Sequence, residues 1–85
     1  MWIVYIIQNS QSKELYFGLT KDLRGRLAQH NNRQNKSTSR KLGKWTLVYA
    51  EAYRDKRDAQ NRENRLKHHG SGKRELMKRL TYSLL

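Results

Sequence analysis

The sequence predicts an α+β fold in which helices flank a small three-stranded antiparallel sheet, in the order β-β-α-β-α-α. Two short apolar runs near the start of the chain are separated by a polar stretch with no intervening helix, which indicates a hairpin. The apolar pattern then changes from the period of a strand to that of a helix, and one further strand-like run lies between helical segments. Helices packed on such a sheet make one layered domain, 1–85, because 85 residues leave no room for a second core.

The three predicted strands are apolar runs rich in β-branched and aromatic residues. Residues 2–7 have the continuous apolar character of a buried strand, and after a polar turn residues 15–19 return as its partner. Gly18 within the second strand predicts a bulge or the close approach of another group to the backbone. Residues 45–53 form the third strand, and strict alternation predicts three side chains on one face: Trp45, Leu47 and Tyr49.

Helix signals begin directly after the hairpin. Thr20 is the predicted N-cap of the first helix, and Asp22 lies in its first turn, where a negative charge favours the helix dipole. Leu23 and Leu27 are four residues apart and therefore share a face of this helix, which is predicted to continue to about His30.

The second and third predicted helices occupy the last third of the chain. Asp55 is the predicted N-cap of a helix that continues to about His68, with Asp58 in its first turn. Three small residues are predicted to separate it from the next helix: Gly70, Ser71 and Gly72. The last helix is predicted over 73–80, and its apolar side chains face the core: Leu76, Met77 and Leu80.

The composition indicates a partner with many negative charges. The formal net charge is +12, from 19 Lys and Arg against 7 Asp and Glu, and such a field favours a polyanion because bound phosphates release counterions. Nucleic acid is the leading partner; an anionic membrane is disfavoured because the basic segments lack a broad apolar face. The absence of cysteine excludes disulfides and thiolate zinc sites. With no signal peptide and no spanning segment in the sequence, we expect a cytoplasmic protein.

Five side chains could carry out chemistry on a phosphodiester. Tyr5 and Tyr16 lie on the two strands of the hairpin, and Arg26 and His30 are four residues apart on one helix face. Glu63 lies in the middle of the second helix, with a lysine four residues further on. Taken singly, each has an ordinary explanation: paired aromatic residues fill cores, basic helix faces are solvated, and a glutamate and a lysine form a surface ion pair.

The order of these residues resembles that of the GIY-YIG endonuclease superfamily. The chain contains the motif IVY, which ends at Tyr5, and then the motif YFG, which begins at Tyr16 after ten intervening residues. These are followed by DLRGRLAQH, a basic loop, WTLVYAE and NRENRLK. The pattern is most similar to the small stand-alone bacterial members and to the N-terminal nuclease domain of an excinuclease, and it extends from residue 2 to about residue 80. Two residues depart from the name motifs, Ile3 in place of glycine and Phe17 in place of isoleucine, and neither departure removes a chemical group.

The resemblance assigns roles residue by residue. It matches Tyr5 and Tyr16 to the motif tyrosines, Gly18 to the glycine of the second motif, and three further side chains to the helix arginine, the histidine one turn on and the metal-binding glutamate: Arg26, His30 and Glu63. It implies one divalent ion, Mg²⁺ or Mn²⁺, and hydrolysis of DNA by water. Independently, a lone carboxylate suits one Mg²⁺, which typically keeps several waters, and does not suit a two-metal cluster.

We expect Tyr5 to activate the water and Tyr16 to orient it or the phosphate. An unperturbed tyrosine is ionised only about one part in a thousand at pH 7, and the positive charge of Arg26 is expected to favour the phenolate. Arg26 would also neutralise charge that develops on the phosphate, His30 would position or move a proton, and Glu63 would hold the metal against the leaving 3′ oxygen.

The polar segment 31–44 is predicted to be a loop that binds the nucleic-acid backbone. It contains no acidic residue, and six of its side chains are predicted to contact phosphates: Arg33, Lys36, Thr38, Arg40, Lys41 and Lys44. His68 and His69 are interpreted as ordinary helix-end residues, which the helix dipole favours.

Three functions fit these patterns. The leading one is a metal-dependent endonuclease that selects DNA by its structure during repair or processing, with RNA as a further substrate class. The alternative is a nucleic-acid-binding module on the same scaffold that does not cut, or cuts only with a protein partner that supplies specificity. A basic protein of an RNA assembly accounts for the charge but not for the combination of tyrosines, arginine and glutamate: Tyr5, Tyr16, Arg26 and Glu63.

Overall fold

The structure is a computed structural model that describes residues 1–35, 38–68 and 70–85. Its elements follow the predicted order β-β-α-β-α-α and confirm the α+β class. They are β1 (Trp2–Asn9), β2 (Leu15–Thr20), α1 (Leu23–Asn31), β3 (Trp45–Tyr53), α2 (Lys56–His68) and α3 (Gly70–Arg79).

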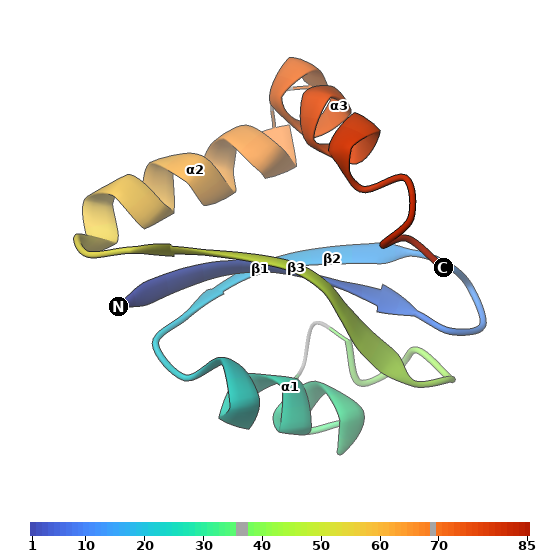
Figure 1. Ribbon diagram of the computed structural model, residues 1–85. Helices are drawn as coiled ribbons and strands as arrows, with labels where there is room; N and C mark the ends of the chain where they lie inside the picture. Colours follow the sequence, from blue (N-terminus) through green and yellow to red (C-terminus); the bar gives the residue numbers. More distant parts are fainter. Residues whose placement is uncertain (36–37, 69) are drawn as a thin grey trace.

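The sheet is antiparallel with the strand order β2-β1-β3, so the first strand lies in the middle and both of the others are edges. Helix α1 covers one face, while α2 and α3 lie on the other (Figure 1). Because β1 is covered on both faces, it needs apolar side chains at successive positions, as its sequence WIVYII provides.

Two apolar clusters hold the layers together. The larger one lies between the sheet and the two C-terminal helices, and its buried members are Val4, Ile6, Phe17, Ala59, Leu66, Leu76 and Leu80. The smaller one lies on the α1 face, where Tyr5, Ile7 and Trp45 are buried against Leu23 and Leu27. The apolar positions predicted for α1 and α3 therefore do pack against the sheet.

One predicted strand face is wrong. Tyr49 pairs with Ile6 and Leu47 pairs with Ile7, so the register skips Val48 and a bulge interrupts the alternation. Tyr49 therefore packs against the larger cluster, whereas Trp45 belongs to the smaller cluster on the opposite face.

Helix α1 begins later than predicted. Asp22, rather than Thr20, is the N-cap: its Oδ1 atom accepts a hydrogen bond from the Gly25 amide at 3.0 Å. Thr20 is the last residue of β2, and its hydroxyl accepts the Asp22 amide at 3.1 Å. Because Asp22 has an extended φ/ψ, it can end the strand connection and cap the helix at the same time.

The last two helices are separate, as predicted, but the predicted start of the last one at residue 73 is wrong. Gly70, Ser71 and Gly72 form the first turn of α3 rather than a linker. Small residues are tolerated there, and the burial of Leu76 and Leu80 further along supplies the packing that holds the helix. The N-cap predicted for α2 agrees with the structure, since Asp55 Oδ1 accepts the Arg57 amide at 2.8 Å.

A polar network fixes α2 on β3. The Glu51 carboxylate accepts hydrogen bonds from the hydroxyls of Tyr49 (2.5 Å) and Tyr53 (2.7 Å) and from Nε of Arg62 (2.6 Å). Burial alone would raise the pKa of Glu51, but these three hydrogen bonds outweigh it and lower that pKa. Since Arg62 directly precedes Glu63, the network also sets the rotation of the helix that carries Glu63.

Within the described residues, no helix is both long enough and apolar enough to pass through a membrane.

Candidate active site

Tyr5 extends from the central strand over the edge strand β2. It pairs with Gly18, and a Cβ atom added to Gly18 would lie 2.2 Å from Cζ and 2.3 Å from Oη of Tyr5. The tip of the ring therefore occupies the space that any larger residue at position 18 would need. The close approach to the backbone predicted at Gly18 is this ring, and it places the Tyr5 hydroxyl at the β2 side of the sheet.

Tyr16 and His30 surround the Tyr5 ring. The ring centroids of Tyr5 and Tyr16 are 6.4 Å apart, and that of His30 is 5.9 Å from Tyr5 and 5.0 Å from Tyr16. His30 comes from the last turn of α1. The hairpin and the following helix thus bring together three of the predicted residues, and the spacing of the two tyrosines had indicated that those two could be neighbours.

His30 is fully buried and has a partner on each ring nitrogen. Its Nε2 atom lies 2.8 Å from Tyr5 Oη, and its Nδ1 atom lies 2.7 Å from Thr38 Oγ1. Burial, and secondarily the positive charge of Arg26, lowers the pKa of His30. The imidazole is therefore neutral near pH 7 and can accept a proton.

Arg26 approaches Tyr5 from α1, one turn before His30. Burial raises the pKa of Tyr5, and Tyr16 adds to this rise. The positive charge of Arg26 opposes that rise but does not overcome it. The expected stabilisation of the phenolate by Arg26 is therefore outweighed, and Tyr5 stays protonated.

Glu63 lies on α2, the helix on the other side of the sheet from α1 (Figure 1). It is only 8% exposed, its Oε1 accepts Gln60 Nε2 at 3.2 Å, and its Oε2 lies 3.3 Å from Lys67 Nζ. Its negative charge contributes to the raised pKa of Tyr5, so the two groups lie within electrostatic range. The ion pair with Lys67 forms as its spacing suggests, yet Glu63 is buried and does not lie on an exposed helix face.

The donor set around Glu63 suits one hard cation. Among the described residues, no three His, Cys, Asp or Glu side chains gather as a metal cluster. A single carboxylate fits Mg²⁺ or Mn²⁺ bound largely through water and substrate phosphate, the usual manner of Mg²⁺.

The predicted phosphate-binding residues of the loop divide into groups. Arg40 and Lys44 are exposed. The Arg33 guanidinium donates to the Lys41 carbonyl, and Lys41 Nζ pairs with Glu14 at 2.8 Å. Lys36 lies outside the described residues, as does His69 in the helix-end pair, whereas His68 is the exposed last residue of α2.

Thr38 lies elsewhere than expected. The sequence predicts that it faces phosphate, but it is 2% exposed and its hydroxyl is engaged by His30. A threonine in a polar loop carries no sequence signal for such a contact, because the partner is set by how the loop folds back on α1.

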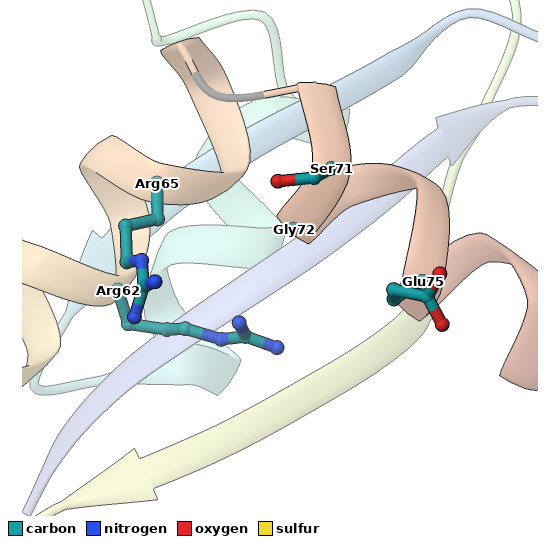
Figure 2. A pocket seen from close by; sticks show the side chains of 5 residues that line it. All are labelled: Arg62, Arg65, Ser71, Gly72 and Glu75. Carbon is teal, nitrogen blue, oxygen red and sulfur yellow. The ribbon is translucent and has the colours of Figure 1, made fainter.

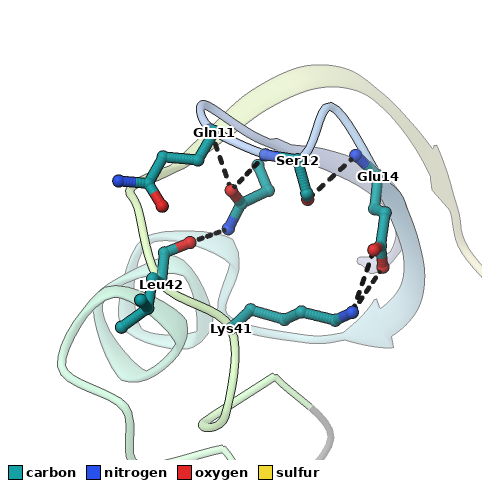
Figure 3. Close-up of polar contacts among 6 residues, drawn as sticks. Gln11, Ser12, Glu14, Lys41 and Leu42 are labelled. Carbon is teal, nitrogen blue, oxygen red and sulfur yellow. Dashed lines mark hydrogen bonds and ion pairs between the residues drawn. The ribbon is translucent and has the colours of Figure 1, made fainter.

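Sequence reasoning also missed Asn9, which is fully buried. Its Oδ1 accepts the amides of Gln11 (2.9 Å) and Ser12 (3.1 Å), and its Nδ2 donates to the Leu42 carbonyl at 2.7 Å. Together with the Lys41–Glu14 pair, these contacts attach the basic loop to the hairpin turn (Figure 3). Asparagine at a strand end before a turn is a recognisable Asx-turn signal, which could have identified it.

A separate hollow of about 270 Å³ lies between α2 and α3. It is lined by Arg62, Arg65, Ser71, Gly72 and Glu75 (Figure 2). It contains none of the predicted catalytic residues, and Arg62 is already paired with Glu51.

Comparison with known proteins gives two matches. A family model described as the GIY-YIG catalytic domain matches residues 1–76. The UPF0213 protein CPE1444 of Clostridium perfringens (strain 13 / Type A) is 39% identical over 64 residues, which cover 75% of this chain and 68% of that protein. No solved structure matches significantly.

Proposed function

Because the chain belongs to the GIY-YIG family, we propose that it is a cytoplasmic endonuclease that hydrolyses DNA phosphodiester bonds with one divalent ion, Mg²⁺ or Mn²⁺. The family comprises nuclease catalytic domains, so nucleic acid is the substrate class. The proposal is supported by the buried contact of Tyr5 with His30 and by the electrostatic influence of Arg26 and Glu63 on the same phenol, from residues of β1, α1 and α2.

The charge of the protein supports a nucleic-acid backbone as ligand. A net charge of +12 attracts phosphates over the whole surface, and the exposed Arg40 and Lys44 supply cations on the loop next to the candidate site. Contacts to phosphates fix the position of the protein on DNA without reading its bases. We therefore propose that the enzyme selects DNA by its structure, in repair or processing. A partner protein would supply further specificity.

The proposed proton transfer uses the neutral His30. The water oxygen forms the new bond to phosphorus while the bond to the 3′ oxygen breaks. One water proton moves to the Tyr5 oxygen as the Tyr5 proton moves to Nε2 of His30, 2.8 Å away. This concerted transfer avoids a free phenolate, which burial disfavours. The leaving 3′ oxygen takes a proton from solvent, and the imidazolium returns one to solvent.

Three groups would stabilise charge during this step. Arg26 lies beside the Tyr5 hydroxyl, where its guanidinium can offset negative charge on the attacked phosphate. Tyr16, packed against the His30 ring, would orient the water or the phosphate. Glu63 would hold the divalent ion, which when bound neutralises charge on the phosphoryl and leaving oxygens.

The decisive test replaces Glu63 with glutamine. We expect Glu63→Gln to abolish Mg²⁺- or Mn²⁺-dependent cleavage of labelled DNA structures while DNA affinity stays equal or rises, because one negative charge near the phosphate is removed. Glu75→Gln is the matched control: this carboxylate is exposed on α3, pairs only loosely with Lys78 (3.5 Å), and its loss is expected to leave cleavage unchanged. Cleavage by Glu63→Gln at the wild-type rate would refute the proposal.

One observation favours the non-catalytic alternative: Glu63 already has a cationic partner in Lys67. If wild-type protein with either ion binds duplex, flap and branched DNA or RNA but cuts none of them, the chain is a binding module that needs a partner or does not cut at all.

A further inference from the structure

Thr38 makes a buried contact that the proposed chemistry does not yet use. The residue lies on the loop between α1 and β3, is 2% exposed, and places its hydroxyl 2.7 Å from His30 Nδ1. His30 is itself fully buried, so a ring nitrogen without a partner there would lose its hydrogen bonds to water with nothing in exchange. Thr38 satisfies the nitrogen that faces away from Tyr5.

The proposed proton transfer requires one of the two neutral forms of the imidazole. Tyr5 Oη lies 2.8 Å from His30 Nε2, and the phenol can pass its proton to this nitrogen only if Nε2 carries no proton of its own. In a neutral imidazole the proton is therefore on Nδ1, and Nδ1–H donates to Thr38 Oγ1.

We propose that Thr38 is a positioning residue for the Tyr5–His30 pair: its hydroxyl oxygen accepts Nδ1–H and holds His30 in the tautomer whose Nε2 lone pair faces the Tyr5 hydroxyl. This inference rests on the proposed nuclease function. The other tautomer would place a proton on Nε2, and His30 could then take no proton from Tyr5. Thr38 acts through His30 and does not touch the reacting atoms.

The backbone around Thr38 holds its hydroxyl in place. Its amide donates to the Asn35 carbonyl at 3.2 Å, and its carbonyl accepts the Lys41 amide at 3.1 Å. Lys41 in turn pairs with Glu14 of the hairpin turn, and the neighbouring Leu42 carbonyl is bound by the Asn9 side chain (Figure 3). The hydroxyl is thus carried by a segment attached to the sheet at two further points.

The test compares two variants of similar size. Thr38→Val keeps the volume but removes the acceptor, and Thr38→Ser keeps the hydroxyl. The ¹⁵N chemical shifts of the His30 ring, identified by their loss in His30→Asn, report the tautomer without any need for activity. We expect Nδ1–H in wild type and in Thr38→Ser, and a shift toward Nε2–H in Thr38→Val.

Cleavage kinetics on the same proteins give the second readout. We expect Thr38→Val to lower kcat by about 10- to 1,000-fold with little change in KM, because a wrong tautomer impairs proton transfer and not binding. Thr38→Ser should remain within about threefold of wild type.

The outcomes separate this inference from the proposed function. An Nε2–H tautomer in wild type overturns the inference even if Thr38→Val does not fold. An active wild type with an unchanged tautomer or kcat in Thr38→Val also overturns it, and leaves the nuclease proposal standing. A wild type that cuts nothing defeats the nuclease proposal and with it the catalytic meaning of the contact.

Discussion

Replacing Gly18 with alanine is a direct test of the geometry at the edge strand. The new Cβ atom would lie 2.2 Å from Cζ and 2.6 Å from Cε1 of Tyr5, whereas ordinary contacts begin at about 3.4 Å. The ring must therefore retreat by roughly 1 Å, although it is 1% exposed and packed against Tyr16 and His30. Such a shift also breaks the 2.8 Å hydrogen bond from Tyr5 to His30.

The expected cost follows from these two effects. Overpacking of a filled core typically destabilises by about 1–3 kcal/mol, and the lost buried hydrogen bond adds about 1 kcal/mol. We therefore expect Gly18→Ala to lower the free energy of unfolding by about 2–4 kcal/mol. Cleavage should fall by about 100-fold or more, since a displacement of about 1 Å at a reacting group has that order of effect.

Urea denaturation and single-turnover cleavage measure the two effects. Gly72→Ala in α3 is the matched control, because among the described residues its Cβ would meet only the Arg65 carbonyl of α2, at 3.7 Å. We expect the control to keep wild-type cleavage and to be as stable as wild type or up to about 1 kcal/mol more stable. A double-mutant cycle introduces Gly18→Ala into the Tyr5→Leu variant, whose shorter side chain leaves the space free. In this background Gly18→Ala should lower the free energy of unfolding by less than about 1 kcal/mol.

Equal destabilisation by Gly18→Ala in the wild-type and Tyr5→Leu backgrounds would show that the ring is not the obstacle. Unchanged stability and unchanged cleavage in Gly18→Ala would refute the placement of the Tyr5 hydroxyl over the edge strand.

Three further predictions concern the rest of the site. Because the pKa of His30 in the folded protein lies below its ordinary value of 6.5, the unfolded chain binds more protons than the folded chain as the pH falls through this range. The free energy of unfolding of wild type in urea should therefore fall as the pH drops from 7 toward 5, and it should fall less in His30→Asn. Asn9→Ala should lose about 2–3 kcal/mol in the same assay, since three hydrogen bonds are removed, and a loss below about 0.5 kcal/mol would contradict this. Arg40→Ala and Lys44→Ala should each reduce the slope of log Kd against log salt by about 0.9 while cleavage positions stay the same; an unchanged slope would remove them from the DNA interface.

Local patterns were sufficient for most of the fold. The apolar run of β1, the single polar turn and the pair Leu23 and Leu27 depend on period and length, which neighbouring residues determine. Element ends were less predictable. Thr20 and Asp22 are both good cap residues, and the backbone conformation after β2 selects Asp22.

The tyrosines, Arg26, His30 and Glu63 could be named as candidates from their order along the chain. Their common location could not be derived from local patterns, because it depends on Gly18 leaving room for Tyr5 and on α2 being held against β3 by the Glu51 network. The bulge at Val48 was equally out of reach, since it depends on how β3 pairs with β1.

Amino-acid order thus determines the elements, the charge and the chemical groups of this protein, because each of these is a property of residues and their near neighbours. Only folding in three dimensions decides that Thr38 leaves the loop surface for His30, that burial keeps the Tyr5 phenol protonated, and that the charge of Glu63 acts on this phenol from the opposite layer. Desolvation and contact between distant segments arise only once the layers have packed, and they determine which proton can move.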